Sequence, residues 1–345
     1  MKKPIIRPIL KKDNHQIASV IRKVLIDFRV PKVGTAYADK ALDALYEAYQ
    51  KPRAIYFVIE FDGHIIGGGG IAKLDNCEEN ICELQKIPMG TAISEFSSGQ
   101  FETNLHHVSD ALVACDQALL LRRAVRETAK EFGLGATFMA KPFLESAGSG
   151  MHIHISLKDA EDNLIFGLDD ANSTGFNNGI QHAIGGLAET MKEGMAIFCP
   201  NANSYRRFQP GFFAPITPNW GPNHRNLSLR IPLSDSKNVR IEHRAAGADA
   251  NPYLVMASVL SGIHYGLKNE VSPPTMISEG EVIDPEVTLP VKWHEALEAF
   301  SQAEVLPQYL SKEYCEVFHK CRSCEMDRFT SQISNKDFEW YLRSI

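Results

Sequence analysis

Several features are scarce in this sequence of 345 residues, and each absence excludes a class of protein. There is no run of eighteen apolar residues, and Pro8, Lys11 and Lys12 interrupt the N-terminal apolar stretch, so neither a membrane partner nor a signal peptide is expected. The seven cysteines lack the spacing of a disulfide framework, which indicates reduced thiols and a cytoplasmic protein. A net charge of −6 makes nucleic acid an unexpected partner.

Composition and charge predict a globular protein made of two pieces. Hydrophobic residues make up 44% of the chain and charged residues 23%, which is enough for a sizeable core. Residues 1–87 carry 14 Lys and Arg against 11 Asp and Glu, whereas residues 88–345 carry 22 against 31. This change of sign predicts pieces of different origin that join between Ile87 and Pro88.

The first piece has the pattern of a small α/β segment. Residues 5–10 predict a strand, and residues 13–28 and 37–51 predict helices, the first with apolar positions at helical spacing, namely Ile17, Val20, Ile21, Val24 and Leu25. Two β-rich runs meet at Asp62 and Gly63, a strong hairpin signal, and residues 81–87 begin another strand. This order resembles the opening of the GNAT acetyltransferase fold, so residues 1–87 are expected to be a partial GNAT-like segment.

That segment lacks the loop that would bind acetyl-CoA. In the GNAT family a glycine-rich turn after the fourth strand holds the cofactor's pyrophosphate at a helix N-terminus. Here the corresponding strand runs into "PMGTAISEF", which contains no such turn. The run from Gly67 to Gly70 lies inside a strand pattern and predicts a bulged or closely packed strand. N-acetyl transfer is therefore only the third function considered.

Acidic residues and histidines of the second piece form candidate ligand pairs. Glu95 and Glu102 are seven residues apart and converge only if a bulge or turn lies between them. If they converge, their oxygen atoms suit Mg²⁺ or Mn²⁺; otherwise they are two glutamates on a solvated strand edge. His152 and His154 lie on one face of a strand, either as metal ligands or as a packed, hydrogen-bonded pair.

Arginines are concentrated in the same piece. Six of them fall within forty residues: Arg206, Arg207, Arg225, Arg230, Arg240 and Arg244. The alternation in "NVRIEHR" predicts a strand that carries Arg240, Glu242 and Arg244 on one face. Clustered guanidinium groups require anions and match phosphate and carboxylate. Together with the acidic and histidine pairs, they predict a site for a nucleoside triphosphate and a carboxylate substrate.

The second piece also resembles a known family. "SEFSSGQFETNLHH", "FMAKPFLESAGSGMHIHISL", "NANSYRRFQPGFFAP", "NHRNLSLRIP" and "RIEHRAAGADANPYLVMASVLSGI" are similar, in order and spacing, to the catalytic-domain motifs of the glutamine synthetase family, and most closely to its γ-glutamylputrescine synthetase branch. The resemblance covers residues 88–345. It implies an α+β fold, a curved antiparallel sheet with helices, in an ATP-dependent and Mg²⁺- or Mn²⁺-dependent ligase. Such enzymes convert the γ-carboxylate of glutamate to γ-glutamyl phosphate, which ammonia or an amine attacks.

The resemblance also implies roles for individual residues. It places four ligands around the metal ions: Glu95, Glu102, His152 and Glu242. It assigns the ATP contacts to His154, Ser156, Arg225, Arg230 and Arg240. It assigns the glutamate contacts to Gly148, Arg207 and Arg244, and it makes Arg225 and Glu242 the catalytic residues.

Two departures from the family pattern bear on the substrate. Glutamine synthetases read "PGYEAP", with a glutamate that helps to bind and deprotonate ammonium, whereas this chain reads "PGFFAP" with Phe213 in that place. Ala147 stands where ammonia-using members carry Asn. A phenyl ring accepts no proton but lines a pocket for an aliphatic amine. A putrescine-like amine is therefore expected in preference to ammonia.

Another departure concerns completeness. Neither the family's N-terminal β-grasp domain nor its Glu-x-Glu strand, which completes the metal sites, precedes Glu95. Turnover by this chain is therefore in doubt, and the alternative is a non-catalytic remnant or fusion that keeps weak ATP binding or subunit assembly. A homo-oligomer is expected if the assembly surfaces survive.

Overall fold

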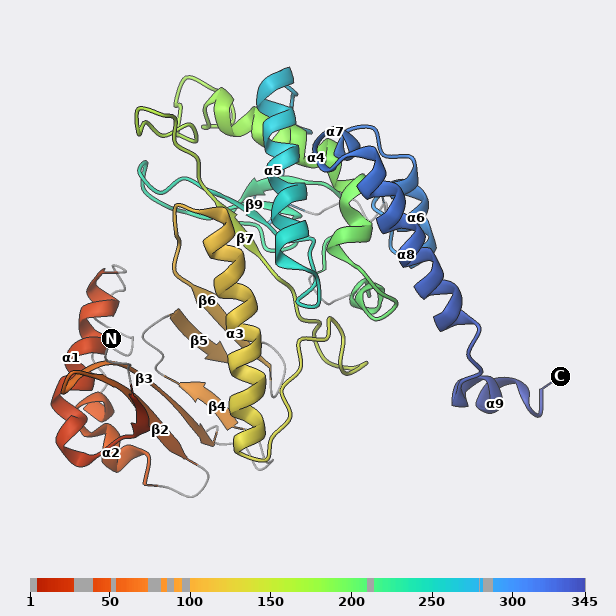
Figure 1. The fold of residues 1–345 in the computed structure, drawn as a ribbon. Helices are drawn as coiled ribbons and strands as arrows, with labels where there is room; N and C mark the ends of the chain where they lie inside the picture. The colour runs from red at the N-terminus through yellow and green to blue at the C-terminus, as the bar shows by residue number, and fades with distance from the viewer. Residues whose placement is uncertain are drawn as a thin grey trace. The chain divides into compact units, whose positions relative to one another are not determined.

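The computed structural model describes residues 5–27, 40–50, 54–73, 82–85, 90–94, 100–209, 214–278, 280–281 and 288–344 (Figure 1). The chain forms two compact units, Met1–Asp110 and Ala111–Ile345. The junction predicted between Ile87 and Pro88 lies outside the described residues. No helix in the described ranges is long and apolar enough to cross a membrane.

The first unit contains a four-stranded antiparallel sheet in the order β1-β2-β3-β4. Its elements are β1 (Ile5–Pro8), η1 (Lys11–Asp13), α1 (Asn14–Asp27), η3 (Lys40–Ala44), α2 (Leu45–Ala48), β2 (Ile55–Phe61), β3 (His64–Lys73) and β4 (Cys82–Gln85). Ile17 and Ile21 of α1 are buried with Tyr56 and Val58 of β2. The predicted strand, helices and meander are confirmed, and the apolar face of α1 forms part of the core.

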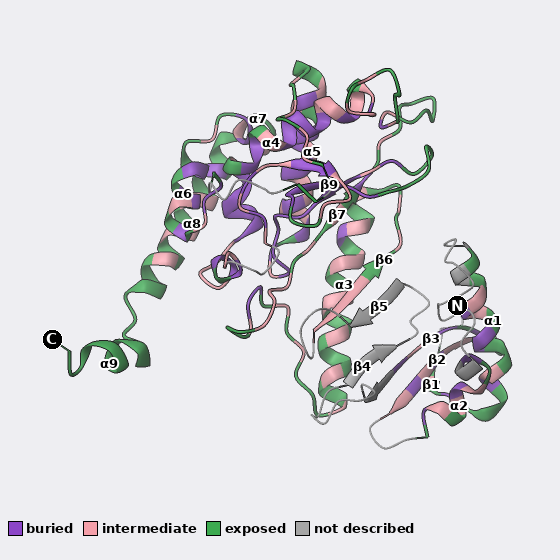
Figure 2. Ribbon diagram, turned by 180° about the vertical axis from the view of Figure 1, so that it is seen from behind, coloured by how far each residue is buried: buried purple, intermediate pink, exposed green. Residues whose placement is uncertain are grey.

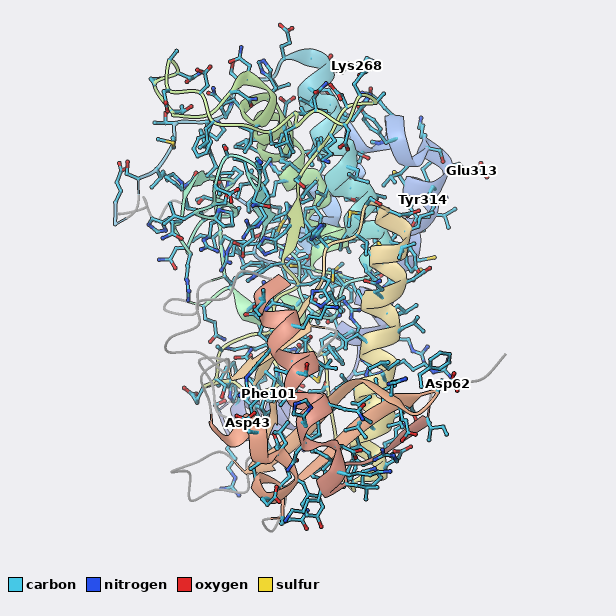
Figure 3. The ribbon with its side chains drawn as sticks, turned by 90° about the vertical axis from the view of Figure 1, so that its left-hand side faces the viewer. Asp43, Asp62, Phe101, Lys268, Glu313 and Tyr314 are labelled. Carbon is cyan, nitrogen blue, oxygen red and sulfur yellow. The ribbon has the colours of Figure 1, made fainter. Side chains whose placement is uncertain are left out.

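The hairpin between β2 and β3 turns at Asp62 and Gly63, as predicted (Figure 3). Both residues have positive φ, 51° and 80°, the conformation that a two-residue type I′ turn requires. Further along, the register shifts beside Ile59, and a Cβ atom on Gly70 would lie 2.5 Å from the Tyr56 ring. The glycine run is therefore the bulged, closely packed strand that the sequence predicts.

The first unit also contains a strand pair, β5 (Gly90–Ser94) and β6 (Phe101–Leu105), in which Ile93 is the antiparallel partner of Glu102. Glu95 and the turn predicted at residues 97–99 lie outside the described residues. β5 and β6 form a sheet of their own, so the curved sheet that the family resemblance implied for the site does not include Glu102 in the described structure. The sequence carried no signal for the strand partner of Glu102.

The second unit contains the sheet β7-β10-β9-β8 and helices around it. The strands are β7 (Ile153–Ile155), β8 (Trp220–Pro222), β9 (Leu229–Ile231) and β10 (Ile241–His243). β10 is antiparallel to β7 and β9, as expected, but β8 and β9 are parallel. Six residues connect β8 to β9, beginning with Asn223, whose φ is 52°. They return the chain to the start of β8, so that β9 runs in the same direction. The expectation of a purely antiparallel sheet is therefore wrong at β8.

Helices supply most of the core of this unit. They are α3 (Ala111–Glu131), α4 (Asn178–Phe198), η4 (Ser204–Arg207), α5 (Pro252–Asn269), α6 (Trp293–Ser301), α7 (Leu306–Leu310), α8 (Lys312–Thr330) and α9 (Asn335–Tyr341). α4 is largely buried (Figure 2). Its N-cap Asn177 accepts a hydrogen bond from the Ile180 backbone N–H at 3.1 Å, which stabilises the start of the helix. Gly186 lets α4 approach Gly266 of α5 so closely that a Cβ atom would lie 2.5 Å from the facing backbone.

Candidate active site

The candidate site is centred on Glu242, the middle residue of β10. Its direct neighbours in the sheet are His154 on β7 and Arg230 on β9. The Glu242 side chain is 2% exposed. Strand alternation turns Ile241 and His243 to the opposite face of β10, where His243 packs on the Phe198 ring at a centroid distance of 4.7 Å. Pairing across the short strands therefore brings charged side chains from separate segments to one carboxylate.

Two guanidinium groups neutralise that carboxylate. Arg230 Nη1 lies 2.7 Å from Glu242 Oε2, and Arg244 Nη1 lies 2.5 Å from Oε1. His152 Nδ1 is 3.2 Å from Oε1. Burial alone raises the pKa of the Glu242 carboxyl, but His152, Arg244 and Arg230 outweigh it and hold that pKa well below its ordinary value. Glu242 is therefore ionised at neutral pH, and the group carries excess positive charge.

Each histidine of the pair has a charged partner in the described structure. His154 Nδ1 accepts a hydrogen bond from Arg240 Nε at 3.2 Å. Burial, with the charge of Arg240 among its neighbours, lowers the pKa of His154 to about 4 although Glu242 opposes it. Burial and the nearby Arg244 likewise lower the pKa of His152. Both imidazoles are thus neutral at pH 7, and His154 is an acceptor for Arg240.

The predicted neighbours Arg207 and Gly148 also come together. Arg207, on η4, is 4% exposed, and its Nη1 donates to the Ala245 carbonyl oxygen at 3.2 Å. A Cβ atom on Gly148 would lie 2.7 Å from Arg207 Cγ, so only glycine fits without displacing that side chain. η4 itself is held by Asp249, whose Oδ2 accepts hydrogen bonds from Ser204 and Asn201 at 2.7 and 2.8 Å.

Other predicted site residues lie further from Glu242 or cannot be related to it. Ser156 and Arg225 are exposed, although the Arg225 charge, after burial and Arg230, helps to lower the pKa of Arg244. Glu102 belongs to the first unit, where it accepts a hydrogen bond from Asn104 at 2.8 Å. Glu95 and Phe213 lie outside the described residues.

The described residues favour an anion over a cation at this site. They contain no group of three or more His, Cys, Asp or Glu side chains that could hold a metal ion. His152 and Glu242 are two potential metal ligands, but both Glu242 oxygens already accept hydrogen bonds from guanidinium groups. The Nε atoms of Arg230 and Arg244 are buried without a hydrogen-bond partner in the described part of the chain. Buried donors next to surplus positive charge match phosphate or carboxylate oxygens.

Sequence reasoning missed the residues that support the arginines. Asn223 accepts a hydrogen bond from Arg230 Nη2 at 2.8 Å, and Asp249 anchors the turn that carries Arg207. Both are polar residues inside the quoted motifs, which was the available signal. Their roles depend on which strand or turn they face, and spacing along the chain does not encode this.

Comparisons with known proteins find similar sequences over most of the chain. The sequence profile described as "Glutamine synthetase, catalytic domain" matches residues 73–341, and so begins before the boundary predicted at residue 88. The chain is 43% identical to γ-glutamylputrescine synthetase of Escherichia coli (strain K12), over 79% of this chain and 57% of that protein. It is 33% identical to glutamate–isopropylamine ligase of Pseudomonas sp, over 73% of this chain and 55% of that protein.

The fold is similar to solved structures as well. The structure titled "Apo GmaS without ligand" matches with a TM-score of 0.64 and 28% identity, over 76% of this chain and 58% of that one. The structure titled "GmaS/ADP complex-Conformation 1" matches with a TM-score of 0.62 and 28% identity, over 73% of this chain and 58% of that one. The chain therefore spans less than two thirds of the length of these relatives.

Proposed function

The chain belongs to the glutamine synthetase family, and we propose that it carries the ATP and glutamate site of a ligase that forms γ-glutamyl amides. In that reaction the γ-phosphoryl group of ATP passes to the γ-carboxylate of glutamate, which leaves ADP. The amine nitrogen then attacks the acyl carbon, inorganic phosphate leaves, and the amine loses a proton. The observation that carries the proposal is the arginine group around Glu242, which has excess positive charge and unsatisfied donors.

The proposal gives the described residues distinct roles. Arg230 and Arg240 neutralise the ATP phosphates, since Arg230 is held by Glu242 and Asn223 and Arg240 by His154. Arg225, at the exposed edge, approaches the transferring phosphoryl group, and His154 and Ser156 contact ATP. Arg207 and Arg244 hold the glutamate carboxylates beside Gly148. Glu242 is the group that fixes two arginines in these positions.

Mg²⁺ or Mn²⁺ at Glu95, Glu102, His152 and Glu242 stays a prediction of the family resemblance. Among the described residues the donors near Glu242 do not form a cation site by themselves. No step above is therefore routed through a metal ion. A homo-oligomer is part of the same proposal.

An organic amine is proposed as the second substrate. The two relatives compared above are named for putrescine and isopropylamine, and a third, at 28% identity, for ethanolamide formation. Phe213 and Ala147 in place of polar residues support the same choice, because neither side chain accepts a proton from ammonium. The 43% identity to the putrescine enzyme makes a putrescine-like diamine the first amine to test.

One observation favours a second candidate, ATP binding without turnover. Both Glu242 oxygens are engaged by guanidinium groups, so the described site attracts phosphate whether or not a metal ion is present. This chain would then bind ATP weakly and assemble with related subunits.

The partial GNAT-like character proposed for residues 1–87 rests on the order of their elements. The observed sheet order β1-β2-β3-β4 and the hairpin at Asp62 support it. The matched family profile begins at residue 73, so it assigns residues 73–87 to the glutamine synthetase catalytic domain and leaves the GNAT-like proposal with residues 1–72.

Phosphate release separates the two functions. The purified chain is incubated with ATP, Mg²⁺ and glutamate, and then with putrescine or ammonium. The ligase proposal predicts phosphate release that requires both glutamate and putrescine and exceeds that with ammonium. ATP binding by titration without glutamate-dependent phosphate release would support the second candidate instead.

A further inference from the structure

A cavity of about 300 Å³ lies in the second unit between η4, the start of α6 and the end of α8. Its apolar wall includes Trp293, Met326 and Phe329. The Trp293 and Phe329 rings meet edge to face, with centroids 6.3 Å apart and an interplanar angle of 67°. Phe329 is 50% exposed although it is a large apolar residue. The volume and the two rings suit a small molecule with a planar apolar body.

The rim of the same cavity carries two cations, Arg206 and Lys292, and the imidazole of His294, all of them exposed. Lys292 forms an ion pair with Glu295 at 3.1 Å, whereas no ion pair of Arg206 is found among the described residues. α6 begins at this rim, and its N-cap Lys292 provides no side-chain cap for the first backbone N–H groups. The helix dipole favours an anion at this position, where Glu295 of the first turn already pairs with Lys292, so Arg206 is the rim cation left for a ligand.

Two buried donors adjoin the cavity without a hydrogen-bond partner in the described part of the protein. They are the Tyr205 hydroxyl and Trp293 Nε1, on residues that are 9% and 7% exposed. Burial raises the pKa of Tyr205 well above its ordinary value, so the phenol stays protonated. Buried donors normally have an acceptor.

We propose that this cavity binds a small aromatic carboxylate. The ring lies against Trp293 and Phe329, and the carboxylate faces Arg206 and His294. This site goes beyond the proposed ligase function, and none of the arginines bonded to Glu242 lines it. Tyr205 and Arg206 nevertheless share the turn η4 with Arg207, so the cavity lies behind the element that presents the proposed glutamate clamp.

The test uses indole-3-carboxylate as the probe and the uncharged indole-3-carboxamide as its analogue. Each is titrated into the full chain at pH 7 and observed by ligand NMR. We expect saturable binding of the carboxylate and at least about tenfold weaker binding of the amide, because a charge-assisted contact is lost. Arg206→Gln should weaken binding of the carboxylate about tenfold, and His294→Gln should weaken it less. Lys320→Gln, an exposed position on α8, is the matched control and should have no effect.

The outcomes also separate this cavity from the Glu242 site. Excess ATP should leave the bound probe in place. Displacement by ATP would mean that the probe occupies the arginine group, and it would overturn the proposal. Absence of saturable binding, equal affinity for acid and amide, or full binding by both Arg206→Gln and His294→Gln would overturn it as well.

Discussion

Glu242 and Arg230 are direct partners across β10 and β9, and Arg230 Nη1 lies 2.7 Å from Glu242 Oε2. The same carboxylate holds Arg244, which is two residues further along the chain. One buried anion thus sets the position of two cations. The Nε–H donors of both guanidinium groups are buried, so the fold and not the solvent sets their orientation.

The first prediction concerns the stability that Glu242 provides. Glu242→Gln keeps the shape of the side chain but leaves Arg230 and Arg244 without their counter-charge. Removing one partner of a buried ion pair costs about 3–5 kcal/mol, because the remaining charge stays buried. Urea unfolding should show a loss of that size, against a negligible change for Glu298→Gln, an exposed position on α6. A loss below about 1 kcal/mol would mean that solvent compensates the arginines.

The second prediction concerns acid sensitivity and His243. Burial lowers the pKa of His243 to about 3, and the nearby His152 adds to this shift. In the unfolded chain a histidine titrates near pH 6.5, so its neutral form favours the folded state fully above that pH. As the pH falls from about 6.5 towards 3, the unfolded state binds the proton first, and stability decreases by up to about 1.4 kcal/mol per pH unit.

His243→Leu removes this contribution. The free energy of unfolding of the variant, measured between pH 7 and 5, should depend less steeply on pH than that of the unchanged chain. His294→Gln, an exposed histidine, serves as the control and should keep the original slope. Identical slopes for all three proteins would show that His243 is accessible to protons in the folded state.

The third prediction concerns packing in the first unit. A Cβ atom on Gly70 would lie 2.5 Å from a Tyr56 ring carbon and 2.6 Å from a Tyr49 ring carbon. Gly70→Ala should therefore destabilise this unit by about 1–3 kcal/mol, the usual cost of overpacking. Hydrogen exchange of the β2 and β3 amides measures the effect, with the exposed Ser19→Ala on α1 as the control. Unchanged protection of β2 and β3 would contradict the close packing of the tyrosines.

The fourth prediction concerns acetyl-CoA. Gly67 to Gly70 form part of β3, so they do not provide a phosphate-binding turn in front of a helix. Titration of the chain with acetyl-CoA should therefore give no saturable binding at micromolar concentration. A saturable isotherm that free coenzyme A reverses would overturn this interpretation of the first unit.

Local signals predicted a large part of the fold. Asp62 and Gly63 specify a turn with positive φ at both positions, and the apolar positions Ile17 and Ile21 mark the buried face of α1. These features depend on a few consecutive residues, which is why the sequence reveals them. The charged face of β10 was predicted in the same way, from alternation alone.

The pairing of distant segments was not predictable by the same means. Alternation shows which face of a strand Glu242 occupies, but not that Arg230 lies opposite it. Alternation likewise gave no sign that both Glu242 oxygens accept from arginines in the described structure, and the metal-ligand role that the family resemblance implies for Glu242 stays a prediction. The separate sheet of β6 was missed for the same reason, since strand partners are chosen by tertiary packing.

The central claim is that the arginine group binds the phosphates of ATP, and a titration with ATP at increasing salt tests it most directly. Arg240→Gln is the variant of choice, because Arg240 contacts His154 and its removal leaves the Glu242 ion pairs intact. Lys237→Gln, an exposed cation nearby, is the control. The account predicts that ATP binds and adenosine does not. The affinity for ATP should fall with salt, and Arg240→Gln should weaken ATP binding about tenfold. Equal binding of ATP and adenosine, or unchanged affinity in Arg240→Gln, would contradict it.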